Sequence, residues 1–121
     1  MAREHFKDFR ARRQEQNERV LKTENLVIKR LFSLDQATYK DGALSGKTKE
    51  LLGLVASMVL RCNDCIDYHL EKCVNHNYSR QEIEEAMSVA TLVGGSIVIP
   101  HLRHAYESLE DLEEERQADS T

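Results

Sequence analysis

Residues 51–62 read LLGLVASMVLRC, and this stretch decides the fold. Its large side chains recur at the spacing i, i+3, i+4, i+7, i+8 and i+11, which places them on one face of an α-helix. The members of this face are Leu51, Leu54, Val55, Met58, Val59 and Cys62. The apolar run from Leu51 to Leu60 is about half the ~20 residues that a membrane-spanning helix needs. The stretch therefore predicts a buried core helix and no membrane span.

The composition around this helix is that of one helical domain. The chain has 121 residues and a net charge of -4, with 40% hydrophobic and 31% charged residues, which fits a single globular domain. One proline and five glycines argue against a loop-rich β-sandwich and against a disordered linker protein. The first residues contain no apolar segment of the kind found in secretory signal peptides.

The residues before the core helix predict further helices. A stretch rich in Arg, Glu and Gln without a helix breaker predicts one long helix from about Ala2 to Phe32. We expect an interruption near residues 23–25 and a short helix beginning near Asp35. Gly and Ser residues at 42–46 mark the turn into the core helix.

The residues after the core helix carry clear start and stop signals. Ser79 and Glu82 have the spacing of a capping box, and the glycines at 94–95 end the helix that follows. A last helix opens near Ser96, with Pro100 in its first turn. The sequence thus predicts an all-α bundle of five or six helices. We expect three parts: an N-terminal helical extension (1–31), a core domain (32–112) and an acidic, frayed tail (113–121).

Charge is distributed unevenly along the chain. Residues 1–30 hold nine Lys and Arg against five acids, whereas residues 107–121 hold one Arg against seven acids. The basic stretch is interrupted by acidic residues and has no aromatic platform, so we do not expect a nucleic-acid partner. The oppositely charged ends of the chain can attract each other between subunits.

The three cysteines indicate redox or metal chemistry. Cys62, Cys65 and Cys73 are an odd number within twelve residues, which is a poor disulfide framework for a secreted protein and favours the reducing cytoplasm. Two thiols three residues apart at a helix start can close a disulfide, and the helix N-terminus favours a thiolate. His69 lies one turn beyond Cys65 on the same face and is the natural proton acceptor. We interpret Cys73 as a small buried apolar residue.

A metal site is the alternative interpretation of the same residues. Five potential ligands share one helix face, namely Cys62, Cys65, His69, Cys73 and His76. They span about 21 Å along a helix, so one tetrahedral zinc ion cannot collect them. His101 with His104, or Glu50, would have to contribute from a second element, and His76, His101 and His104 have no other assignable role. A thioredoxin-like site is not expected, because a helix rather than a strand precedes the pair.

Taken together, these motifs resemble the alkyl hydroperoxidase D-like branch of the carboxymuconolactone decarboxylase superfamily. The matching features, over residues 32–112, are Gly42-Ala-Leu44, Lys47-Thr-Lys-Glu50, Arg61-Cys62-x-x-Cys65-x-x-x-His69, Ser79-Arg-Gln-Glu82 and Val93-Gly94-Gly95. The resemblance implies an all-helical subunit in trimers or hexamers that needs no bound cofactor. It further implies a thiol-dependent peroxidase or disulfide reductase, with a peroxide or disulfide substrate and a protein thiol/disulfide electron donor.

The resemblance also assigns roles to the site residues. Cys65 would attack the substrate, Cys62 would resolve the oxidised thiol, and Glu50 and His69 would relay protons through a water. In one unbroken helix Glu50 would lie about 18 Å from Cys62, so a relay requires a break near residues 61–64. This chain has Asn63 and Asp64 where some relatives carry a second histidine. A cofactor-free decarboxylase of lactone acids and a metal-binding or structural oligomer are the alternatives.

Overall fold

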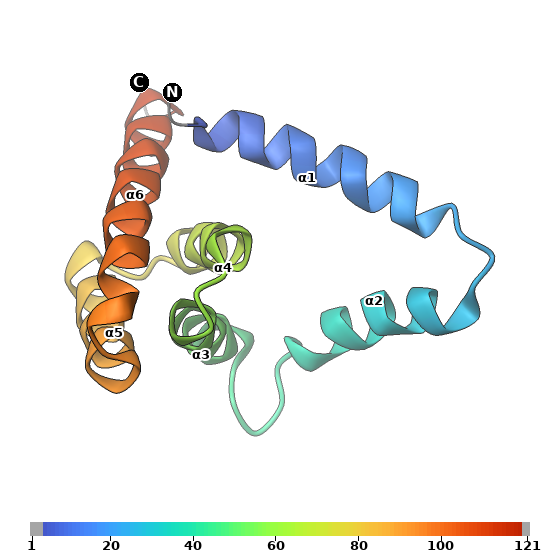
Figure 1. Cartoon of the computed structure of the whole chain (residues 1–121), viewed down its shortest axis with the longest axis horizontal. Helices are drawn as coiled ribbons and strands as arrows, with labels where there is room; N and C mark the ends of the chain where they lie inside the picture. Colours follow the sequence, from blue (N-terminus) through green and yellow to red (C-terminus); the bar gives the residue numbers. More distant parts are fainter. Residues whose placement is uncertain (1–3, 120–121) are drawn as a thin grey trace.

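The computed structural model describes residues 4–119, and within this range the chain forms six α-helices, one short 3-10 helix and no strand (Figure 1). The predicted all-α fold is confirmed. Ala2, where the first helix was expected to begin, lies outside the described residues. The helices are α1 (Phe6–Leu21), α2 (Leu26–Thr38), α3 (Gly46–Val59), α4 (Asn63–Asn75), α5 (Arg80–Gly94), the 3-10 helix η1 (Ser96–Val98) and α6 (Ile99–Asp119).

The hydrophobic core lies where α3, α4, α5 and α6 pack together, and α3 has its most extensive contacts with α4 and α5. The face predicted for residues 51–62 supplies much of this core. Leu54 and Met58 are completely buried, and Leu51, Val55 and Val59 pack against the buried cluster. A helix that is covered on this face by two neighbours is the arrangement that the i, i+3, i+4 spacing requires.

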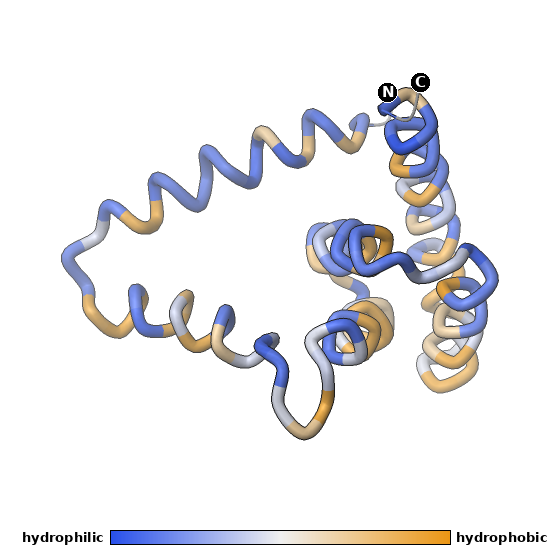
Figure 2. Tube along the Cα trace, turned by 180° about the vertical axis from the view of Figure 1, so that it is seen from behind, coloured by the Kyte–Doolittle hydropathy of each residue, from blue (hydrophilic) through white to orange (hydrophobic). Residues whose placement is uncertain are grey.

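The helices α1 and α2 form an arm that extends away from this bundle and returns to it (Figure 1). The start of the arm is anchored by Phe6 and Phe9, which are buried in the core with their rings 5.3 Å apart in an edge-to-face arrangement. Arg10 continues the attachment through ion pairs with Glu71 and Glu115. By contrast, α2 buries none of its residues. Hydropathy colouring shows α1 as largely hydrophilic along its length (Figure 2).

The first half of the chain differs from the sequence prediction in one respect. The interruption near residues 23–25 is confirmed, and the Asn25 side chain caps α2 by accepting a hydrogen bond from the Ile28 amide at 3.1 Å. This cap starts a helix that continues to Thr38, so the prediction of a separate helix beginning near Asp35 is wrong. The expected boundary between residues 31 and 32 consequently falls inside α2.

The acidic C-terminal segment, expected as a tail over residues 113–121, is helical as far as Asp119, where α6 ends. Residues 120–121 lie outside the described part of the chain. Contacts with the body of the protein hold this last stretch of helix. Arg116 donates to the Val74 carbonyl at 2.9 Å, and Glu113 pairs with Arg80. The ion pair is partly exposed and contributes about 1 kcal/mol or less.

The ends of the later helices are placed as predicted. The capping box between Ser79 and Glu82 is complete at the start of α5. Gly95 ends this helix with a φ of 85°, a conformation that L side chains rarely adopt. Pro100 lies in the first turn of α6, where its missing amide hydrogen is not needed. Among residues 4–119, every helix is too short or too polar to cross a membrane.

Candidate active site

The turn between α3 and α4 determines where the cysteine pair lies. At the end of α3 the Cys62 amide donates to the Ser57 carbonyl at 3.1 Å and the Arg61 amide donates to the Met58 carbonyl at 3.0 Å. These two bonds form a Schellman motif, whose left-handed position is Arg61, with a φ of 61°. The helical path therefore breaks at Arg61, inside the stretch where a break was expected, and α4 folds back along α3.

Cys62 ends one motif and begins the next, because it is also the N-cap of α4. Its sulfur accepts a hydrogen bond from the Cys65 amide at 3.3 Å. Cys62 and Cys65 are joined by a disulfide across this first turn, with their Cα atoms 5.3 Å apart. Cys65 is exposed, whereas Cys62 is half-buried. Cys65 is thus the more accessible of the two cysteines, while the helix-end amide points to the sulfur of Cys62. The partial positive charge of the helix end favours a thiolate in the reduced pair.

Behind this pair, Glu50 and His69 are in direct contact. Glu50 lies on α3 and His69 on α4, and the Glu50 Oε2 to His69 Nδ1 distance is 2.9 Å. Only 4% of Glu50 and 8% of His69 is exposed, so the pair is shielded from water. The fold-back at Arg61 thus brings together the two predicted relay residues. The 2.9 Å distance allows a direct hydrogen bond between them.

Three neighbours fix the imidazole of His69. Gly53 lies against one side of the ring, where a β-carbon would come within 2.7 Å of His69 Cε1. The rings of Tyr39 and Tyr68 lie 5.2 Å and 5.1 Å from the imidazole, and the Tyr39 hydroxyl is 3.4 Å from Nε2. Tyr39 was not predicted as a site residue. Its position in the chain gives no signal, because Tyr39 reaches the site only through the return of the arm at the end of α2.

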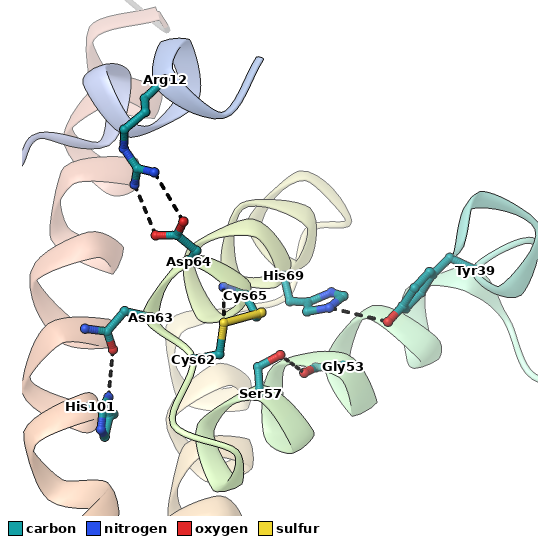
Figure 3. The surroundings of a disulfide bond; sticks show 10 residues. All are labelled: Arg12, Tyr39, Gly53, Ser57, Cys62, Asn63, Asp64, Cys65, His69 and His101. Carbon is teal, nitrogen blue, oxygen red and sulfur yellow. Dashed lines mark hydrogen bonds and ion pairs between the residues drawn. A yellow bond between two sulfur atoms is a disulfide. The ribbon is translucent and has the colours of Figure 1, made fainter. Parts of the chain in front are cut away.

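The residues between the two cysteines are held from outside α4 (Figure 3). Asn63 Oδ1 lies 2.7 Å from His101 Nδ1 on α6. Asp64 forms two hydrogen bonds with the guanidinium of Arg12 on α1, at 3.1 Å and 3.3 Å. This contact of His101 was not predicted from the sequence. Where some relatives were expected to carry a second histidine, this chain has two residues that tie the redox helix to its neighbours.

One turn further along α4, a buried carboxylate joins α4 to α6. Asp67 is 6% exposed. It accepts a hydrogen bond from the Ser108 hydroxyl at 2.6 Å, and its oxygens lie 2.9 Å and 3.0 Å from His104 Nε2. His104, which had no predicted role, is thus part of the contact that positions α4.

Cys65 and His69 open into a cavity of about 300 Å³ between the arm and α4. Its walls are formed by Arg13, Gln16, Asn17, Asp35, Asp64, Cys65, Tyr68 and His69. Cys65 and His69 therefore share one solvent-accessible space, while Glu50 is buried behind the imidazole. The arm contributes half of the wall residues, which the sequence alone did not indicate.

The third cysteine is separate from this chemistry. Cys73 is fully buried, and burial raises the pKa of its thiol to about 12, with a smaller contribution from the charge of Glu50. This confirms its interpretation as a buried apolar residue. Within residues 4–119 there is no group of three or more His, Cys, Asp or Glu side chains that could hold a metal ion.

The chain that carries this arrangement matches a known family model. Residues 26–108 match the model of the carboxymuconolactone decarboxylase family. The chain belongs to the carboxymuconolactone decarboxylase family. This family includes alkyl hydroperoxidase D-like proteins, as the sequence resemblance suggested.

Solved structures of family members have the same fold. A carboxymuconolactone decarboxylase family protein from Thermotoga maritima, for which a part in the antioxidative response has been suggested, is 54% identical and superposes with a TM-score of 0.88 over 93% of this chain and 96% of that one. A family member from Legionella pneumophila, solved in its apo form, is 33% identical, with a TM-score of 0.75 over 90% of this chain and 95% of that one.

Two curated relatives match more weakly, and both are uncharacterised. A protein of Cupriavidus necator is 27% identical over 60 residues, which is 50% of this chain and 53% of that protein. A protein from the cox locus of Paracoccus denitrificans is 26% identical over 82 residues, or 68% of this chain and 74% of that protein. This chain therefore spans about half the length of the first of these relatives.

Proposed function

We propose that this protein is a thiol-dependent oxidoreductase that reduces peroxides or disulfides with the Cys62–Cys65 pair. The observation that supports this most strongly is the buried Glu50–His69 contact beside a cysteine pair whose Cys65 sulfur is exposed to a cavity. A carboxylate that holds one ring nitrogen of a histidine fixes the tautomer and leaves the other nitrogen to accept a proton. Such a pair activates a nearby nucleophile.

In the proposed reaction with a peroxide, the Cys65 proton first passes to His69, whose charge Glu50 stabilises. The Cys65 thiolate attacks one peroxide oxygen, so that an S–O bond forms and the O–O bond breaks. The leaving oxygen takes the proton from His69 and departs as an alcohol. Cys65 is thereby oxidised by two electrons to a sulfenic acid, and the peroxide is reduced by the same two electrons.

Cys62 then completes the cycle. Its thiol attacks the sulfenic acid sulfur of Cys65, an S–S bond forms, the S–O bond breaks, and water leaves. The Cys62–Cys65 disulfide of the structure supports this step, because the step would form the same bond. The half-buried position of Cys62 suits a resolving residue, which must reach Cys65 but not the substrate. A dithiol donor then returns two electrons to the pair by thiol–disulfide exchange.

The proposal is tested on the reduced full-length chain by adding one equivalent of a hydroperoxide and mapping the products by mass spectrometry. We expect a Cys62–Cys65 disulfide in the wild type, a trappable sulfenic acid on Cys65 in Cys62→Ser, and no turnover in Cys65→Ser. Glu50→Gln and His69→Ala should lower turnover by about 10²–10⁴-fold. Cys73→Ala is the matched control and should remain active.

Full peroxide turnover by Cys65→Ser would overturn this mechanism. Decarboxylation of a lactone acid would survive loss of both thiols, so a Cys62→Ser/Cys65→Ser double variant that turns over such an acid would establish that alternative. A structural zinc would instead appear in elemental analysis at about one ion per chain and be lost together with the helical fold on chelation.

We further propose that the active form is a homo-oligomer. An isolated helix of the length of α2, which has 13 residues and none of them buried, is only marginally stable in water. Four large apolar residues of α2 are exposed, namely Leu26, Val27, Leu31 and Leu34. A second apolar face at the end of α5 and in η1 exposes Val89, Leu92, Val93 and Ile97. A second copy of the chain can cover both faces.

A reducing compartment such as the cytoplasm would keep the Cys62–Cys65 pair in its active dithiol form between cycles.

A further inference from the structure

The face of α1 that is turned toward α4 changes from apolar to polar residues beside the cysteine pair. Phe6 and Phe9 are buried in the core, whereas the residues that follow on the same face are Arg13 and Asn17, which are half-buried. These four residues are three or four positions apart, so they lie on one side of the helix, the side that is turned toward α4. If α1 only packed against the bundle, apolar residues would continue along this face. Polar residues replace them where the face borders the cavity with Cys65.

Arg13 is the one arginine of α1 in this cavity, and no carboxylate among the described residues is paired with it. Arg10, Arg12 and Arg19 each form ion pairs with acidic side chains. The guanidinium of Arg13 instead lies over the ring of Tyr68, 4.1 Å from its centroid. This stacking holds the planar group in place while its hydrogen-bond donors remain unused. A guanidinium held in this way is suited to bind a carboxylate.

An acidic residue faces the cavity from the other side of the arm. Asp35 lies on α2, on the same helix face as Phe32 and Tyr39, and no ion pair within residues 4–119 involves it. The other carboxylate in the wall, Asp64, accepts two hydrogen bonds from Arg12, which also pairs with Glu4. Among the described residues, Arg13 and Asp35 are therefore the wall charges without an ion-pair partner, with Arg13 on the α1 side of the cavity and Asp35 on the α2 side.

From this placement we infer that the cavity binds a small zwitterionic disulfide, with Arg13 binding the substrate carboxylate and Asp35 its ammonium group. Gln16 and Asn17, which complete the α1 wall, supply amide donors and acceptors for the remaining polar atoms. The class of substrate is thus an amino-acid disulfide rather than an apolar peroxide. This inference rests on the proposed thiol chemistry of Cys65 and deepens it by naming the substrate class.

Such a disulfide would react with the reduced Cys62–Cys65 pair in two exchange steps. The Cys65 thiolate attacks one substrate sulfur, a mixed disulfide forms, the substrate S–S bond breaks, and the first substrate thiolate leaves with the proton held by His69. The Cys62 thiol then attacks Cys65, the mixed disulfide breaks, and the second substrate half leaves as a thiol. The substrate gains two electrons, and the protein pair loses the same two and ends as a disulfide. A dithiol donor resets the pair.

The test compares four small aliphatic disulfides that differ in charge: cystine (zwitterionic), dithiodiglycolate (anionic), cystamine (cationic) and bis(2-hydroxyethyl) disulfide (neutral). The reduced full-length protein is mixed with each, and each rate is divided by the rate of dithiothreitol with the same disulfide, which removes differences in intrinsic reactivity. We expect the normalised rate for cystine to exceed that for the neutral disulfide about tenfold or more, since each charged hydrogen bond contributes that much.

Two substitutions separate the two charges. Arg13→Gln should lower the rates with cystine and dithiodiglycolate about tenfold and leave the rate with cystamine unchanged. Asp35→Asn should lower the rates with cystine and cystamine and leave the rate with dithiodiglycolate unchanged. Arg19→Gln is the matched control, because Arg19 lies on the same helix outside the cavity and pairs with Glu15. Equal normalised rates for all four disulfides would overturn the inference while leaving the proposed function intact.

Binding without reaction separates the two proposals further. L-cystathionine has the shape and charges of cystine but no S–S bond, so its affinity can be measured by calorimetry whatever the reactivity of Cys65. We expect saturable binding that Arg13→Gln and Asp35→Asn each weaken about tenfold and that Arg19→Gln does not change. Failure of the wild type to bind cystathionine overturns the inference. Failure of Cys65 to react with any disulfide or peroxide, with cystathionine binding retained, overturns the proposed function alone.

Discussion

The position of His69 depends on one small residue. Gly53 lies on α3 directly against the imidazole, and an added β-carbon would come within 2.7 Å to 2.9 Å of three ring atoms. His69 cannot move away easily, because the rings of Tyr39 and Tyr68 lie within about 5 Å of it. We therefore expect Gly53→Ala to displace the ring and weaken its 2.9 Å contact with Glu50. A shift of this size should lower kcat/KM for peroxide about 10²-fold.

The matched control is Gly42→Ala, because a β-carbon at Gly42 would meet nothing closer than the Lys49 side chain at 3.7 Å. This variant should retain full activity. Steady-state kinetics and thermal unfolding of both variants provide the measurement. If Gly53→Ala keeps the wild-type kcat/KM, the imidazole is not held in one position and its proposed role in proton transfer is wrong.

Cys73 should behave as an inert thiol. Burial raises the pKa of Cys73 to about 12, so its thiol stays neutral in the native protein at pH 8. Iodoacetamide at this pH should therefore label the reduced protein at Cys65 and leave Cys73 unlabelled. The unfolded chain ionises this thiol near its ordinary pKa of about 8.5. At pH values below the pKa of the unfolded chain, the Cys73 thiol is neutral in both states and does not change stability. Between the unfolded and the native pKa, only the unfolded chain loses the proton, so the free energy of unfolding falls as the pH rises.

The measurement for this linkage is urea unfolding of the wild type and Cys73→Ala at several pH values between 8 and 10.5. The advantage of the wild type over the variant should shrink steadily across this range. A difference that stays constant with pH would show that the native thiol ionises as easily as the unfolded one.

At the scale of the helices, α6 determines how α4 presents its cysteines. The buried carboxylate of Asp67 connects the two helices through Ser108 and His104. Asp67→Ala removes the acceptor of the buried Ser108 hydroxyl and of the partly exposed His104 imidazole, so we expect a loss of about 2–3 kcal/mol in the free energy of unfolding. Asp64→Ala, one turn earlier on the same helix, breaks only an exposed pair with Arg12 and should cost less than about 1 kcal/mol. Equal losses in urea unfolding would contradict this assignment.

The helices show which parts of the fold a sequence can predict. Local signals were sufficient for the capping box at Ser79, the stop at Gly95 and the core face around Leu54 and Met58, because each involves neighbouring residues only. The start expected near Asp35 was wrong, because the side-chain cap of Asn25 had already started a helix that continues through that position. Local patterns identify a good cap residue but cannot show that an earlier cap is used instead.

The candidate site was predictable only in part, for the same physical reason. The C-x-x-C pair and His69 lie on one helix and could be related by spacing. Glu50 is 19 residues away from its partner His69 and was assigned by resemblance alone. Tyr39, Asp67 with His104, and the wall residues of α1 come from contacts between elements far apart in the chain, and no periodicity in the sequence records such contacts.

At the scale of the whole molecule, the single chain leaves its arm incompletely packed. In the described part of the chain, fourteen large hydrophobic residues are exposed, and several of them are concentrated on α2 and at the end of α5. Burial of such residues between subunits would stabilise the arm and thereby also the wall of the cavity that α1 and α2 form beside Cys65. Assembly and activity should therefore be coupled.

This coupling can be tested with single charges on the two apolar faces. Leu92 is 85% exposed and Leu34 is 63% exposed in the single chain, so replacing either with Glu would cost an isolated subunit almost nothing. If a second copy covers these faces, Leu34→Glu and Leu92→Glu bury a charge at the interface and should dissociate the oligomer. Leu44→Glu, in the loop outside both faces, should not. Sedimentation velocity gives the mass of each variant. Peroxide turnover measured at the same protein concentration should fall only in the variants that dissociate. A wild type that sediments as a single chain would refute the proposed assembly.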